Sequence, residues 1–358
     1  MVVPTPFIPR STTLQILSGA ALQDRLPELT AYAMRGTLTA LSRHPAWLNV
    51  FREAFGHTPF VIESRDGSQT VGILPLVFVR STLFGRFLVS LPYLNSSGVI
   101  ADSSRIADQL IGEAVNLAQE LKVRHLELRH EVPIPHPAFH TTNSSKVHMR
   151  LSLPDFPGPL WESLKDKVRN QVRKGEKNRL TVHWGTLDEL HSFYDIFAVN
   201  MRDLGTPVYG RKLFQSVLKQ FPHHAELCVV RLQEKPIAAG LLVHGNGVSE
   251  ILSASALREF NHTSANMLMY WNLIERCIER GQSEFDFGRS TIGSGTYKFK
   301  KQWGAEETPA HWQYHLLSGN ASEMRPDNPK YQRMIEMWKK MPVWLTRCIG
   351  PSIVRGIP

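Results

Sequence analysis

One order of elements occurs twice along the chain, and this repetition restricts the fold more than any other feature. Apolar spacing in each half predicts a helix, a strand, a turn, two strands, a helix and a strand. In the first half these elements fall at 45–55, 60–63, 65–68, 71–79, 87–94, 104–121 and 125–129. In the second half they fall at 214–221, 226–231, 233–236, 237–244, 249–256, 264–280 and 284–287. Such self-similarity predicts a duplicated α/β module.

A proline-rich segment marks the joint between the two copies. Leu153–Pro159 reads L-P-D-F-P-G-P, and its prolines interrupt both helix and sheet. We therefore predict an α/β (α+β) fold with a domain over 1–154, a second domain over 155–319 and a basic helical tail over 320–358. A further strand at 143–153 is assigned to the first domain.

The stretch Glu284–Gly304 is the strongest candidate for chemistry. A strand with Phe285 and Phe287 on its buried face ends in a loop rich in glycine and hydroxyl side chains. Such a loop lets backbone amides approach a ligand. The alternative is a glycine-rich connection followed by a solvated basic turn.

The formal net charge of +9 is concentrated in two stretches, 165–179 and 325–358, and the remainder is close to neutral. This distribution favours specific anionic partners over a generally basic surface. In a helix predicted over 161–178, Arg169, Arg173 and Lys174 are candidates to grip phosphates. The alternative is a solvated helix face.

Two further turns carry polar groups. Arg202, Asp203 and Tyr209 gather after a helix that Gly205 and Pro207 end, although Arg202 and Asp203 could be only a local ion pair. Thr263, Ser264 and Asn266 lie where the 264–280 helix begins, and a helix N-terminus binds phosphate or carboxylate. The alternative there is simple capping.

Several classes are disfavoured by the sequence. It lacks a tight histidine–carboxylate motif for metal and a G-x-S-x-G elbow, and no apolar run reaches the length of a membrane span. Three scattered cysteines fit a reducing compartment, so we expect a cytoplasmic protein. Aromatic and aliphatic side chains occur beside cations over 330–354, which fits either contact with the inner membrane or docking on the chain's own domain.

Four motifs in order carry a family resemblance: K-V-R-N-Q-V-R-K-G-E-K-N-R-L at 167–180, N-M-R-D-L-G-T-P-V-Y-G at 200–210, F-D-F-G-R-S at 285–290 and G-T-Y-K-F-K-K-Q-W-G-A-E at 295–306. The chain resembles FemAB-related, exosortase/PEP-CTERM-associated proteins of the GNAT acyltransferase superfamily. The resemblance implies tandem GNAT folds around a cleft and transfer of an acyl or aminoacyl group onto an amine. It further implies an envelope or exopolysaccharide precursor as acceptor and acyl-CoA or aminoacyl-tRNA as donor, with no tightly bound cofactor. The segment 261–266 departs from the family because it lacks the glycines of the usual pyrophosphate loop.

On this basis each candidate receives a role. Asp286 is the predicted base and Tyr297 the acid or oxyanion donor, unless Asp286 only pairs with Arg289. Phosphates of the donor are assigned to Arg169, Arg173, Lys174, Thr263, Ser264 and Asn266. Substrate binding is assigned to Arg202, Asp203, Tyr209, Arg289, Ser290, Lys300, Lys301 and Trp303. The alternatives are a non-catalytic module that binds RNA or a lipid-linked glycan, and an assembly factor at the membrane.

Overall fold

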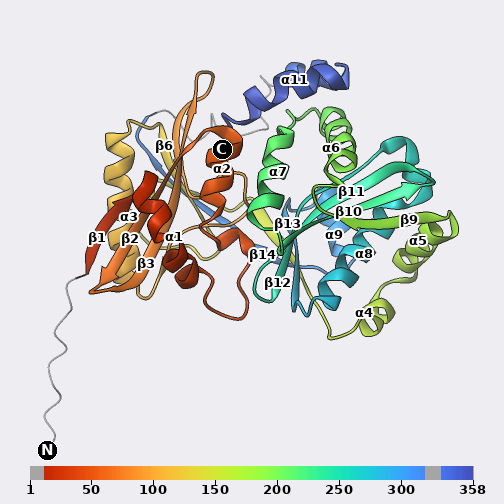
Figure 1. Ribbon diagram of the computed structural model, residues 1–358, viewed down its shortest axis with the longest axis horizontal. Helices are drawn as coiled ribbons and strands as arrows, with labels where there is room; N and C mark the ends of the chain where they lie inside the picture. The colour runs from red at the N-terminus through yellow and green to blue at the C-terminus, as the bar shows by residue number, and fades with distance from the viewer. Residues whose placement is uncertain (1–11, 319–331, 358) are drawn as a thin grey trace, which may run out of the picture.

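Two mixed β-sheets, each flanked by helices, lie side by side in the computed structural model, which describes residues 12–318 and 332–357 (Figure 1). We call the parts built on these sheets the first and the second unit. In the described ranges no helix combines the length and apolar character needed to cross a membrane.

The first unit is a largely antiparallel sheet. Its strand order is β1 (Thr13–Leu17), β2 (Thr58–Asp66), β3 (Gln69–Ser81), β4 (Gly85–Val89), β6 (His125–His130), β15 (His311–Leu316) and β7 (Thr141–Asn143), and β5 (Ile100–Ala101) pairs with β3. Helix α3 (Ser104–Glu120) buries Leu110 and Ile111 against one face, with Ile62 and Leu74 of the strands. Helices α1 (Gly19–Ala33) and α2 (Trp47–Phe55) cover the other face.

The second unit has the strand order β14 (Glu306–Pro309), β8 (Lys146–Ser152), β13 (Glu284–Thr291), β12 (Val248–Ala256), β11 (Lys235–His244), β10 (Ala225–Leu232) and β9 (Leu180–Gly185). On one face lie α5 (Asp166–Lys177) and α8 (Ala265–Glu279), and on the other lie α6 (Leu190–Leu204) and α7 (Arg211–Gln220). The shorter helices are η1 (Leu41–Arg43), α4 (Pro157–Ser163), η2 (Arg258–Thr263) and α9 (Gly295–Lys301).

One apolar core joins the two units. Helix α2 of the first unit packs on α7 of the second, and the ring centroids of Trp47 and Phe221 lie 4.9 Å apart. Trp47, Phe51, Phe193 and Phe214 belong to the same buried cluster. The units therefore share an interior, and the cost of exposing it favours a fixed arrangement.

The predicted pair of helix-flanked mixed sheets is confirmed, but sheet membership does not follow the predicted boundaries at 154 and 319. Strand β8 pairs with β13 and β14 of the second unit, although it was assigned to the first domain. Strand β15, from the second half, pairs with β6 and β7 of the first unit. Alternation shows that a strand has a buried face, and it does not show which sheet supplies the partner.

The described part of the tail contains α10 (Gln332–Lys339) and α11 (Val343–Val354), which pack on α6. Thr346, Gly350 and Val354 form the buried face of α11, and the Tyr93 hydroxyl donates to the carbonyl of Arg355 at 2.7 Å. The docked alternative is thus observed, while Met337 and Trp344 stay 60% and 66% exposed. The predicted helix start at 330–331 lies outside the described residues.

Candidate active site between strands β12 and β13

Strands β12 and β13 run side by side only at their beginnings. Their parallel pairing joins 248–250 to 284–286, after which the two strands separate. Beyond this point β12 carries a bulge, since Leu241 pairs with Ser253 and Leu242 with Ile251, which leaves Leu252 as the extra residue. A bulge takes backbone groups out of the ladder. Because β13 has left the ladder, the later part of β12 also offers an open backbone edge, and its residues 252–256 contribute to the lining of two pockets.

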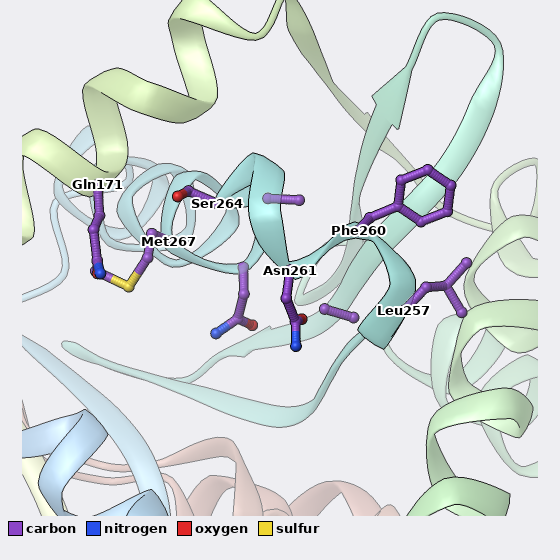
Figure 2. Close-up of a pocket in the computed structure, with 9 residues that line it drawn as sticks. Gln171, Leu257, Phe260, Asn261, Ser264 and Met267 are labelled. Carbon is purple, nitrogen blue, oxygen red and sulfur yellow. The ribbon is translucent and has the colours of Figure 1, made fainter.

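The first pocket, which we call the α8 pocket, lies where α8 begins and has a volume of about 120 Å³. Gln171 of α5 lies beside Met267 at one end, and Phe260 and Leu257 lie at the other (Figure 2). Ser264 adopts a left-handed backbone (φ +64°) and gives α8 no side-chain cap. A helix start of this kind directs amides and a partial positive charge at a ligand.

The residues predicted at this helix start separate into two groups. Ser264 and Asn266 line the α8 pocket. Thr263 does not, because its side chain is buried and its hydroxyl donates to the carbonyl of Phe260 at 2.7 Å. For Thr263 the simple capping alternative is thus the one observed, since its oxygen also accepts from the amide of Ala265.

The predicted phosphate-binding cations flank this region without lining it. Arg169 pairs with Asp166, and the guanidinium of Arg173 lies 5.5 Å from the ring centre of Trp161. Lys174 is exposed and lies one helical turn after Gln171, on the same face of α5. The predicted helix over 161–178 is also interrupted at Leu164, where α4 ends before α5 begins.

The second pocket, which we call the aromatic pocket, has a volume of about 330 Å³ and lies between α2, α6, α7 and β12. Tyr93 and Tyr209 line it, with ring centroids 5.8 Å apart, together with Leu252 at the bulge. Arg202 and Asp203 lie outside it and form the local ion pair that was the alternative, with Nε 2.6 Å from Oδ1.

Asp286 lies at the point where β12 and β13 separate, but its carboxylate is already paired. Arg150 Nε donates to Oδ2 at 3.1 Å, and the amide of Gly288 donates to Oδ1 at 2.6 Å. Burial opposes ionisation, yet His148 and then Arg150 bring the pKa of Asp286 below its ordinary value. The side chain is 2% exposed and lines neither pocket, and its ion-pair partner is Arg150 instead of Arg289.

The cations after Phe287 hold the turn itself. Lys300 Nζ donates to the carbonyls of Gly288 and Arg289, both at 3.0 Å, and burial lowers its pKa to about 8. Arg289 Nε donates to Asn95 Oδ1 at 3.3 Å. Ser290 is buried close by. The structure thus brings together four of the predicted site residues, Asp286, Arg289, Ser290 and Lys300. They hold the backbone at the point where β12 and β13 separate.

The rest of the predicted loop points elsewhere. Tyr297 interacts with Glu307, and this hydrogen bond raises the pKa of its phenol. Lys301 is exposed on α9, and neither side chain lines either pocket. The predicted substrate role of Trp303 draws no support from the geometry, because its indole is fully buried with Tyr270 and Phe299 in the core of the second unit.

Most residues that line the two pockets were not assigned a role from the sequence, among them Gln171, Tyr93 and Leu252. Gln171 lies in the cationic helix that was proposed for ligand binding, so the concentration of positive charge in that helix indicated this part of the site. Leu252 could not have been found, because a bulge depends on the register between two strands.

Comparison with known proteins decides the fold. Residues 162–301 match the family model described as an acetyltransferase (GNAT) domain. The match to the crystal structure of FemX covers 90% of this chain and 100% of the FemX chain, at 14% identity and a TM-score of 0.63. A tandem GNAT protein from the clavulanic acid biosynthesis pathway covers 84% of this chain and 97% of its own, at 14% identity and a TM-score of 0.52. The fold is a tandem GNAT fold.

The structure of L-PGS from Bacillus licheniformis is also similar, at 13% identity and a TM-score of 0.55. The match covers 90% of this chain and 96% of that chain. No curated protein matches the sequence. The likeness to FemX and L-PGS is a likeness of fold, and the strands that separate, β12 and β13, both lie within the matched range 162–301.

Proposed function

We propose that this chain is an N-acyl or aminoacyl transferase of the Fem/GNAT type, which moves an acyl group from an activated ester or thioester to an amine. One observation carries the proposal: the bulge at Leu252 opens the backbone of β12 between the α8 pocket and the aromatic pocket. The GNAT-domain match over 162–301 supports it.

The chemistry follows from this arrangement. The amine nitrogen attacks the carbonyl carbon, a tetrahedral oxyanion forms, and the C–O or C–S bond breaks as the leaving oxygen or sulfur takes up the proton that the amine loses. Backbone amides freed by the bulge are suited to stabilise the oxyanion. The proposed base role of Asp286 draws no support from its buried, paired carboxylate, so we assign Asp286 to positioning the turn at Gly288.

The donor is proposed to be phosphate-bearing, either an acyl-CoA or an aminoacyl-tRNA. The amides at the start of α8 and the exposed Lys174 are suited to phosphate oxygens. An envelope or exopolysaccharide precursor remains the proposed acceptor, as the resemblance to exosortase/PEP-CTERM-associated proteins implies. Neither donor would be held tightly between reactions.

A binding experiment separates the donors. Thermal shift and product formation are measured with acetyl-CoA and with charged tRNA, at about 50 and 200 mM salt. Asn266→Trp, which fills the α8 pocket, should lower affinity for the true donor at least tenfold, whereas Asn170→Trp on the exposed face of α5 should not. Steeply salt-dependent binding without any product would favour the RNA-binding or glycan-binding alternative. Failure of both donors to bind would overturn the transferase.

A second proposal concerns the tail, whose outer surface we propose to contact an anionic membrane. Among the described residues, fourteen large apolar side chains are exposed, and five of them lie in the short stretch 332–357: Met334, Met337, Trp344, Ile349 and Ile357. Cations such as Lys340 and Arg355 accompany them. Apolar groups beside cations suit anionic headgroups and their acyl boundary.

A further inference from the structure

The aromatic pocket is built from both units, and no charged side chain is among the described residues that line it. Trp47 and Phe51 come from α2 of the first unit, while Phe197 and Phe214 come from α6 and α7 of the second. Its volume of about 330 Å³ falls within the range of small-molecule sites, which are mostly apolar with a few placed polar groups.

The walls of the pocket are held in place by contacts that exist without a ligand. The rings of Phe51 and Tyr93 lie 5.4 Å apart, and those of Phe197 and Phe214 lie 4.8 Å apart. The Tyr93 hydroxyl lies 2.8 Å from His57 Nε2, and it donates to the carbonyl of Arg355 in the tail. Burial raises the pKa of both Tyr93 and Tyr209, so both phenols are uncharged at neutral pH.

Polar groups occur at one edge of the pocket, along β12. Ser253 and Ser255 line this edge beside Leu252, and Asn200 Nδ2 donates to Ser255 Oγ at 3.1 Å. A ligand that fills the pocket would thus place an apolar body among the rings and a polar head next to the bulge. That head would lie at the strand segment where the proposed transfer occurs.

We infer that the aromatic pocket binds an uncharged aromatic or branched aliphatic group of one transfer substrate, with its hydrogen-bonding head at Ser253–Ser255. The inference rests on the proposed function, because it makes the pocket a subsite of the transfer site. A charged group is disfavoured because no lining side chain could neutralise it after it left water. The acceptor amine and the acyl group of the donor are the two possible sources of this chemistry.

Direct binding tests the pocket without turnover. Ligand-observed NMR on the full chain compares 2-phenylethanol with 4-(2-hydroxyethyl)benzoate, which has the same head and a carboxylate at the far end of the ring. We expect 2-phenylethanol to bind at least tenfold more tightly. Leu252→Trp should remove binding, whereas Leu187→Trp, at a side chain 43% exposed outside the pocket, should not. If Leu252→Trp does not fold, Met201→Trp replaces it, because Met201 also lines the pocket.

Competition then identifies the source. Displacement of 2-phenylethanol by phenylacetyl-CoA but not by acetyl-CoA assigns the pocket to the acyl group, and displacement by 2-phenylethylamine but not by ethanolamine assigns it to the acceptor. Either result supports the inference. Equal binding of the two alcohols, binding that survives both Trp variants, or displacement by neither class of substrate would overturn it. Probe binding in a chain without transferase activity would instead count against the proposed function alone.

Discussion

The guanidinium carbon of Arg289 lies 3.4 Å from the ring centre of Trp312, and this contact joins β13 of the second unit to β15 of the first. Arg129 lies 3.9 Å from the same ring centre. Burial, and then the charge of Arg129, lower the pKa of Arg289 to about 9. Two cations on one ring, in a partly dry junction, make the indole an important contact between the units.

Trp312→Ala should therefore be strongly destabilising. The change removes both cation–π contacts and the hydrogen bond from Trp312 Nε1 to the carbonyl of Asn95, and it leaves Arg129 and Arg289 close together. We expect a loss of about 3 kcal/mol in the free energy of unfolding, measured by urea denaturation. Trp344→Ala is the matched control, because an indole 66% exposed should change stability by less than about 0.5 kcal/mol.

Glu250 should make the stability of the protein fall as pH rises from 4.5 to about 7. Burial, and then the charge of Asp286, raise its pKa to about 7 from an ordinary value of 4.5. Between these values the folded chain keeps a proton that the unfolded chain has released, so stability falls with rising pH, by about 3 kcal/mol in all. Glu250→Gln should remove this fall, which is measured by urea denaturation at pH 5 and pH 8.

Glu226 provides a control of opposite sign. Burial opposes its ionisation, but His244, Arg276 and Arg280 bring its pKa down to about 2, so its contribution is present above pH 4.5 and is lost as pH falls toward 2. Glu226→Gln should lower stability at neutral pH, where Glu250→Gln raises it. If the wild type and the Glu250→Gln variant have the same pH profile of stability, Glu250 has an ordinary pKa in the folded protein, and the prediction is wrong.

Gly288→Ala should strain the turn where β12 and β13 separate. Gly288 has φ +74°, and a Cβ atom there would lie 2.9 Å from Asn95 Nδ2. We expect a loss of about 2 kcal/mol in the free energy of unfolding. Gly293→Ala separates the two causes, because Gly293 has φ +78° with no atom within 4 Å of the added methyl group. Equal losses in the two variants would mean that the contact with Asn95 is unimportant.

The tail should bind vesicles that contain anionic lipid. In sedimentation with phosphatidylglycerol vesicles at about 100 mM salt, the double variant Lys339→Ala, Lys340→Ala should bind roughly thirtyfold more weakly, since each cation near the surface contributes about 1 kcal/mol. Trp344→Ser should also weaken binding, whereas Phe156→Ser, at a side chain 62% exposed away from the tail, should not. Equal sedimentation with neutral phosphatidylcholine vesicles would contradict an electrostatic contact.

Periodic segments were predictable from the sequence because their partners are local. The helix expected over 264–280 is α8, and the strand expected from Glu284 is β13. Strand β13 nevertheless continues to Thr291, through residues that were predicted as loop, because its last residues pair with β8. Glycine and hydroxyl side chains favour turns, and pairing with a distant strand overrides that preference.

The site was harder to predict because its residues meet only after folding. Ser264 and Asn266 followed from the general behaviour of helix starts. Lys300 was predicted to bind an anionic substrate group, but its amine donates to the carbonyls of Gly288 and Arg289. Tyr93 and Leu252 come from different units, and local spacing does not encode their proximity.

The exchange of β8 and β15 between the two sheets limits how the molecule can move. Each sheet contains a strand from the opposite half of the chain, and the connections that lead to these strands are short, at 144–145 and at 310. A hinge opening between the units would therefore strain these connections, break the bridge between Thr39 and Asn246 and expose the shared apolar core. The α8 pocket and the aromatic pocket consequently keep a nearly constant separation. Substrates must then enter through shifts of side chains and surface loops. The fixed distance between the two pockets limits the length of the molecules that can react.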